Sequence, residues 1–159
     1  MRYRWLGVAA ALLSSGCSNE LPPAPQVLLY ITTDAPLPAP LGVVPDELAP
    51  VPLFDTLRFD VYAAGSDTPC DGCSRVFAVD EALVAQNEAS IGVPASTPLN
   101  EQRVRIRLYL AAAELGDEPS QAGSIDAFVR LPALEADEVQ PLHVLLPTDA
   151  VGSPLGSLA

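Results

Sequence analysis

Short segments in which apolar and polar residues alternate are the clearest pattern in this chain. In residues 103–110, four aliphatic side chains point to one face, and three arginines and Tyr109 point to the other. Residues 57–62 repeat the alternation, with Leu57, Phe59 and Val61 on one side. A period of two is typical of a strand with one buried face. Both segments are therefore predicted to be strands that line a core.

Five more segments are rich in branched and aromatic residues and are bounded by turn-forming residues. They predict strands at 27–32, 75–79, 89–93, 124–131 and 142–146. Asp80 is placed to cap a short helix over 81–86, and the connection before residue 75 has the composition of a turn. Seven short strands separated by turns predict an all-β fold, an antiparallel sandwich of immunoglobulin or transthyretin type.

Proline divides the rest of the chain into loops and flanking segments. Residues 33–55 contain six prolines, which neither a helix nor a central strand accommodates. Loops longer than about 12 to 15 residues tend to be functional or disordered. Residues 148–159 are small, interrupted by proline and without periodicity, and predict a linker-like tail. The sandwich domain is therefore expected to span 27–147.

The first residues have the layout of a secretory signal peptide, expected as a signal helix within 1–16. Arg2 and Arg4 precede an apolar run at 5–13, which is followed by Ser-Ser-Gly and Cys17. A charged start, an apolar stretch and small residues before the cleavage point are the parts of such a signal. The apolar run has about half of the roughly 20 residues that a spanning helix needs. A transmembrane anchor is therefore not expected.

The small residues before Cys17 resemble the lipobox of bacterial lipoproteins, although leucine stands four residues before the cysteine instead of three, with Ser14 in its place. The resemblance implies cleavage before Cys17, lipidation of its thiol and attachment to the membrane through this lipid anchor. Ser18, where an aspartate would signal retention, implies an outer membrane lipoprotein of the cell envelope. Residues 17–26 contain three prolines and are expected to form an extended tether.

Charge limits what the protein is expected to bind. All eight basic residues are arginines, and 20 acidic residues bring the net charge to -12. Removal of 1–16 would take away two of these arginines and leave the exported domain more acidic. Nucleic acid is a poor partner for such a surface, because phosphates are bound by basic patches.

Three of the arginines form the one basic stripe of the sequence. Arg103, Arg105 and Arg107 recur at every second position, which places their guanidinium groups on one face of a strand, roughly 7 Å apart. Such a stripe could bind an anionic glycan of the cell envelope through bidentate contacts. The simpler interpretation is cross-strand pairing with outward carboxylates such as Asp126 and Asp60.

Cys70 and Cys73, in the sequence CDGC, are the only closely spaced cysteines. With Cys17 lipidated, they are expected to form one disulfide in an oxidising compartment and to pin a turn between two strands. The alternative is a thioredoxin-like redox pair, which requires a helix after the motif, whereas residues 74–79 are predicted as a strand. A zinc site would need two further ligands.

Other candidates for chemistry are sparse. His143 lies in a predicted strand, and no serine or cysteine nucleophile stands in a recognisable setting, so no catalytic residue is assigned. Pairs of neighbouring acids in predicted loops could bind calcium, but they lack the spacing of a calcium loop and are otherwise explained by solubility. No cofactor and no metal are assigned.

The segments VLLYITTDAPLP, PLFDTLRFDVY, TPCDGCSR and LLPTDAVGSPLGSLA are together similar to the N-terminal part of bacterial lipoproteins whose downstream half is a formylglycine-generating-enzyme-like (sulfatase-modifying factor) domain. The similarity covers most of 27–159 and transfers no catalytic residue. It implies an accessory, non-enzymatic module. The expected function is therefore a membrane-anchored lipoprotein whose β-sandwich binds or scaffolds an envelope glycan or protein. The alternative is a thiol-redox or enzyme-accessory protein that acts through Cys70 and Cys73.

Overall fold

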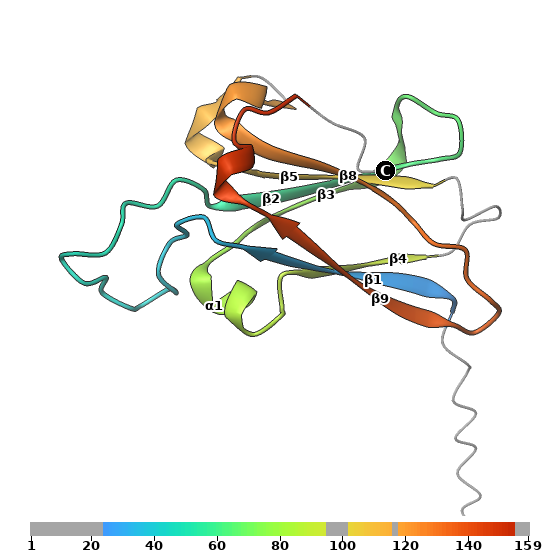
Figure 1. The fold of residues 1–159 in the computed structure, drawn as a ribbon, viewed down its shortest axis with the longest axis horizontal. Helices are drawn as coiled ribbons and strands as arrows, with labels where there is room; N and C mark the ends of the chain where they lie inside the picture. Colours follow the sequence, from blue (N-terminus) through green and yellow to red (C-terminus); the bar gives the residue numbers. More distant parts are fainter. Residues whose placement is uncertain (1–23, 95–101, 116–117, 155–159) are drawn as a thin grey trace, which may run out of the picture.

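Two β-sheets packed face to face make up most of the structure (Figure 1). It is a computed structural model that describes residues 24–94, 102–115 and 118–154. The four-stranded sheet has the order β3-β2-β5-β8, and each neighbouring pair is antiparallel. Its strands are β2 (Thr56–Tyr62), β3 (Pro69–Ala78), β5 (Arg103–Tyr109) and β8 (Ser124–Arg130).

The second sheet has three strands, in the order β4-β1-β9. They are β1 (Gln26–Thr33), β4 (Ser90–Pro94) and β9 (Val139–Leu146). The smaller elements are the helix α1 (Glu81–Ala85), the strands β6 (Glu114–Leu115) and β7 (Glu118–Pro119), and the 3₁₀ turns η2 (Ala111–Ala113), η3 (Gln121–Gly123) and η4 (Thr148–Ala150).

The all-β sandwich expected from the sequence is confirmed, and each of the seven predicted strands overlaps one of the seven longer strands of the described residues. Strand β3 begins at Pro69, within residues predicted as a turn, and β9 begins at Val139, before its predicted start. The predicted helix is also present. Asp80 caps it, because its side-chain Oδ1 accepts a hydrogen bond from the backbone N–H of Leu83 at 2.9 Å. Among the described residues, no helix has the length and apolar character needed to span a bilayer.

Strand order differs from that of the immunoglobulin sandwich, one of the two types that the sequence suggests. In an immunoglobulin constant domain the first strand lies beside the second. Here β1 lies between β4 and β9, in the sheet opposite to β2, so the order is not that of an immunoglobulin domain. The pair β1 and β9 is parallel, which departs from the antiparallel arrangement expected from the sequence. These are the first and last strands, so no tight hairpin joins them and their relative direction is not fixed by a turn.

The core lies between the two sheets and follows the predicted alternation. Every second side chain of the central strands is buried and points to the opposite sheet. The members with no measurable exposure or nearly none include Val27, Leu29 and Ile31 from β1, Leu57 and Phe59 from β2, and Val104, Ile106 and Leu108 from β5. This rigid core fixes the edges and loops described below.

The chain beyond β9 stays in contact with the domain up to residue 153. Both the backbone N–H and the hydroxyl of Thr148 donate to Asp34 Oδ1, at 2.7 and 2.8 Å. These hydrogen bonds lower the pKa of Asp34. The N–H of Gly152 donates to the carbonyl of Ser124. The first residues of the predicted linker-like tail therefore pack on the sandwich, and 155–159 lie outside the described residues.

Candidate functional site

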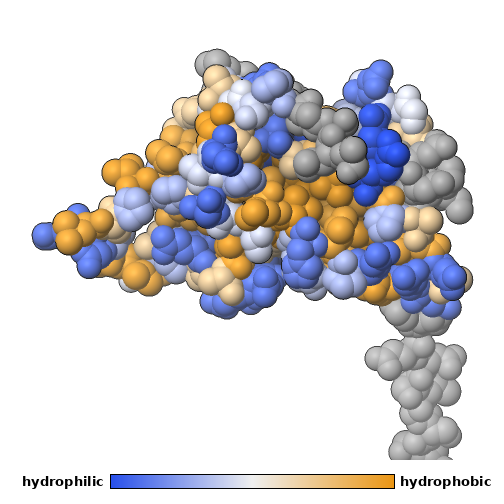
Figure 2. Space-filling view, in the orientation of Figure 1, coloured by the Kyte–Doolittle hydropathy of each residue, from blue (hydrophilic) through white to orange (hydrophobic). Residues whose placement is uncertain are grey.

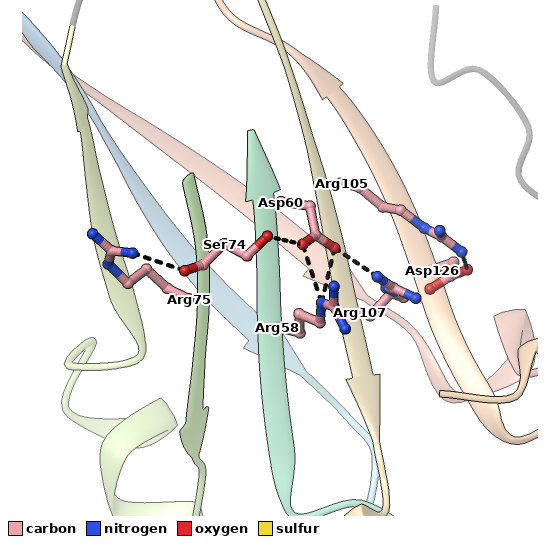
Figure 3. A network of polar contacts seen from close by, with 7 residues as sticks. All are labelled: Arg58, Asp60, Ser74, Arg75, Arg105, Arg107 and Asp126. Carbon is pink, nitrogen blue, oxygen red and sulfur yellow. Dashed lines mark hydrogen bonds and ion pairs between the residues drawn. The ribbon is translucent and has the colours of Figure 1, made fainter. Parts of the chain in front are cut away.

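A network of polar contacts lies on the outer face of the four-stranded sheet, around Asp60 (Figure 3). Asp60 accepts hydrogen bonds from Arg107 at 2.6 Å and from Ser74 at 2.6 Å. The Nε of Arg58 donates to both of its carboxylate oxygens, at 3.0 and 3.1 Å. Three adjacent strands, β3, β2 and β5, are thus joined through one carboxylate.

Strand register explains which charges meet. Asp60 is directly opposite Arg105 on β5, and Arg107 is directly opposite Asp126 on β8. Each arginine instead reaches the diagonal carboxylate, because Arg107 binds Asp60 and Arg105 binds Asp126 at 2.6 Å. Long guanidinium side chains commonly span such a diagonal. The result is a ladder of alternating charges across the sheet.

The ion pair between Asp60 and Arg107 is the most buried pair of this network. The side chains of Asp60 and Arg107 are 0% and 1% exposed. Burial by itself would raise the pKa of Asp60, but the hydrogen bonds from Ser74, Arg107 and Arg58 and the charge of Arg107 outweigh it and lower the pKa below its ordinary value. Asp60 is therefore ionised at neutral pH and serves as the centre of a structural network.

The predicted anion-binding stripe does not present three accessible guanidinium groups. Arg107 is buried against Asp60, and Arg105 is paired with Asp126. Arg103 keeps the most exposure: it donates to the carbonyl of Ser66 at 2.9 Å and lies 6.0 Å from the ring centroid of Phe128. The cross-strand pairing with Asp60 and Asp126, the simpler of the two interpretations, is what the geometry shows.

Cys70 and Cys73 are joined by a disulfide, as expected, but the bridge does not lie in a turn between strands. Strand β3 begins at Pro69, so the CDGC sequence lies within it. Between the pairs Asp60–Ser74 and Tyr62–Pro69, β3 runs through more residues than β2 does, which is a bulge.

Two features hold this bulge in place. Gly72 has a φ of +67°, a conformation that residues with a side chain rarely adopt, and the disulfide closes the chain around it. The structure thus places the bridge at an edge strand, where a bulge prevents further strand pairing. Strand, not helix, follows Cys73 up to Ala78, which favours a structural bridge over the redox alternative.

The remaining candidates are separated from one another. His143 is exposed on β9, where its ring stacks on Tyr30 at 5.1 Å between centroids. No group of three or more histidine, cysteine, aspartate or glutamate residues is placed to hold a metal ion in the described part of the chain. Cys17 lies outside the described residues, so its lipidation stays a prediction.

Comparison of the chain with protein families, curated proteins and solved structures finds no match. The described surface offers a cleft and an exposed loop as candidate binding features.

The cleft opens at the side of the sandwich formed by the edge strands β3 and β4, and has a volume of about 510 Å³. Arg75 stands opposite the fully buried Phe59, so it lies on the inner face of β3. Its Nη1 donates to the carbonyls of Gly72 and Ser74, and it has no ion-pair partner among the described residues. The apolar part of the lining comes from Val61, Ile91, Val93 and the disulfide.

Gln102 adds a polar group to the same cleft. It is buried, and its Oε1 has no hydrogen-bond partner among the described residues. Buried acceptors are nearly always paired in folded proteins. An unpaired acceptor in a cleft lining is a position where a donor from another molecule could bind.

The loop is the protrusion between β1 and β2 at the left of Figure 1. We call residues 41–53 the apolar loop. Every one of them is exposed, and they include six of the ten exposed large apolar residues of the described chain. Figure 2 shows apolar side chains at its tip. The six are Leu41, Val43, Val44, Leu48, Val51 and Leu53.

The base of the apolar loop is anchored in the domain. Ala35, Leu37 and Phe54 are buried in the core, and the N–H of Leu53 donates to the carbonyl of Pro36 at 3.1 Å. At the tip, Asp46 Oδ1 accepts from the N–H of Leu48. The loop therefore has internal order and holds its apolar side chains away from the core that its base joins.

The sequence did not reveal the apolar loop and the cleft, for different reasons. The length of the proline-rich segment did mark it as unusual, but exposure of its apolar residues depends on tertiary structure. Arg75 and Gln102 carry no local signal, because the cleft exists only where two edge strands meet. The Asp60 network could be anticipated, since acids and arginines alternate on the same predicted faces.

Proposed function

We propose that this protein is a membrane-tethered, non-catalytic binding module, and that the apolar loop is its binding surface. The observation that carries the proposal is the exposure of six large aliphatic side chains on one ordered protrusion. Contiguous exposed apolar surface in a folded protein marks a site of interaction.

The charged residues of the four-stranded sheet have structural roles, which leaves the apolar loop as the stronger candidate for binding. Asp60, Arg107, Arg105 and Asp126 are committed to a buried structural ladder, and the disulfide closes a strand bulge. Their positions explain them as parts of the scaffold. The apolar loop has no such structural explanation, because its side chains contact little of the domain.

Burial of the loop at a partner would supply a substantial driving force. Full burial of a Val or Leu side chain contributes about 1.5 to 3 kcal/mol, and part of this gain is offset by the cost of association. Lipid attachment at Cys17, implied by the lipobox resemblance, would keep the module at the membrane, where a partner in the envelope is within reach.

The test is the size of the complex in which the protein is extracted from membranes with a mild detergent. The loop variant carries Leu41→Ser, Val44→Ser and Leu48→Ser. The matched control carries Val76→Ser and Leu145→Ser, which are exposed apolar residues outside the loop. We expect the wild type and the control to migrate together in a larger complex and the loop variant to migrate alone. Equal migration of all three would overturn the proposal.

A further inference from the structure

We propose that the apolar loop of one copy of this protein docks into the β3–β4 cleft of a second copy, so that copies associate head to tail. This inference rests on the proposed function, because it names the occupant of the same binding surface. It draws on the match between loop and cleft in polarity and charge and on their positions at opposite ends of the molecule.

The two surfaces are complementary in chemistry. The loop presents aliphatic side chains on both sides of the acidic pair Asp46 and Glu47. The cleft offers an apolar wall with Arg75, which lacks a carboxylate partner among the described residues, and the unpaired acceptor of Gln102. An acid of the loop could pair with Arg75 in bidentate fashion, and a loop N–H could donate to Gln102.

Position makes the contact intermolecular. The apolar loop lies where β2 begins, whereas the cleft lies where β2 ends, at Val61. A strand of seven residues separates the two places by roughly 20 Å. The base of the loop is fixed to the core, so one copy cannot fill its own cleft. Two different surfaces on each copy give a heterologous contact, which propagates into rings or open chains.

A lipid bilayer fits the loop less well than a protein cleft does. Residues 41–53 contain no tryptophan, tyrosine, lysine or arginine, the residues that anchor segments at a membrane interface. They do contain two acids at the tip, which the negatively charged surface of an anionic bilayer repels. The cleft, in contrast, offers the positive charge of Arg75 to these acids.

The negative net charge of the protein is expected to weaken the association between copies. Copies of the strongly acidic mature chain repel each other, so the contact is expected to be weak between free copies. A membrane tether would raise the effective concentration of copies in one plane. Association would therefore be controlled by how densely the protein populates the membrane.

The experiment uses the full mature chain with Cys17→Ser, so that lipid does not drive association, and measures mass by analytical ultracentrifugation over a wide concentration range. The loop variant is Leu41→Ser, Val44→Ser and Leu48→Ser, and the cleft variant is Arg75→Glu. We expect the parent chain to form dimers and larger species as concentration rises. Each variant alone should associate at least about tenfold more weakly.

Mixing the loop variant with the cleft variant tests directly whether the loop of one copy binds the cleft of another. The loop variant retains an intact cleft and the cleft variant retains an intact loop, so together they should form a one-to-one dimer that does not grow. A monomeric parent at every concentration, or a mixture that stays monomeric while the parent associates, would overturn the inference. Equal loss of association in the control with Val76→Ser and Leu145→Ser would also overturn it, because it would indicate unspecific contact.

Two further outcomes separate this inference from the proposed function. If the parent stays monomeric but floats with vesicles of zwitterionic phospholipid, and the loop variant does not, the occupant is a lipid and head-to-tail docking is wrong. If purified copies stay monomeric while the membrane complex still depends on the loop, the occupant is a different protein. The proposed function then stands without the self-association.

Discussion

Asp60 links three strands of the four-stranded sheet. Its carboxylate is fully buried and binds two arginines and a serine from three strands. A buried ion pair contributes little net stability compared with an apolar pair, but removal of one partner leaves a buried charge without compensation. The network therefore constrains the register of β2 against both of its neighbours.

We predict that Asp60→Asn destabilises the domain by about 3 kcal/mol at neutral pH. The amide keeps the shape of the side chain but no longer offsets the charge of Arg107. Urea unfolding followed by far-ultraviolet circular dichroism measures the change. Asp67→Asn is the control, because that side chain is fully exposed, and it should leave the unfolding free energy within about 0.5 kcal/mol of the wild type. An equal effect of both substitutions would contradict the role given to Asp60.

We also predict that the destabilisation caused by Asp60→Asn depends on pH. Because the pKa of Asp60 is lower in the folded state, its ionisation stabilises the fold above the unfolded-state pKa, about 3.9. That stabilisation is lost as the pH falls from there through the folded-state pKa. The difference in unfolding free energy between wild type and Asp60→Asn should therefore be constant between pH 6 and 8 and shrink below about pH 4. A difference that stays constant down to pH 2 would be inconsistent with this account.

At the scale of elements, strands could be predicted from sequence because their signal is local. The alternation in 103–110 and 57–62 reports directly which face meets the core. The bulge in β3 could not be predicted, because it depends on how β3 is registered against β2 and not on its own composition. The sequence indicated that Arg107 is paired, but not that it is buried, because burial also depends on how the strands are arranged.

The disulfide belongs to the element scale, since it stabilises the bulge of one edge strand. We predict that Cys70→Ser with Cys73→Ser leaves a folded, β-rich domain that is less stable by about 1 to 3 kcal/mol, because the closed ring is small. Chemical unfolding measures the loss, and mass spectrometry of the non-reduced wild type verifies the bridge. Free thiols in the wild type, or a double variant that fails to fold, would contradict this prediction.

At the scale of the whole molecule, tertiary structure decides which apolar residues of the proline-rich segment are exposed. Leu37 and Leu41 belong to the same proline-rich segment, yet Leu37 is buried in the core and Leu41 is fully exposed. No local pattern distinguishes them. Only the folded domain shows which apolar residues form the base of the loop and which remain available for binding.

Attachment to the membrane is a property of the whole chain. We predict that Cys17→Ser moves the protein from the membrane to the soluble fraction, because the apolar run at 5–13 is too short to span a bilayer. Cell fractionation with an alkaline carbonate wash measures this. The variant with Cys70→Ser and Cys73→Ser should stay with the membrane. A Cys17→Ser protein that resists the wash would refute lipid anchoring.

The central claim, that the apolar loop is a binding surface, is tested most directly by photocrosslinking in cells. A photoreactive amino acid replaces Leu48 in one strain and Val76 in another, both being exposed apolar positions. We predict a discrete protein adduct from position 48 and none of that mass from position 76. An adduct of twice the mass of the mature protein would identify a second copy as the partner. No protein adduct at position 48, or the same adducts from both positions, would contradict the claim.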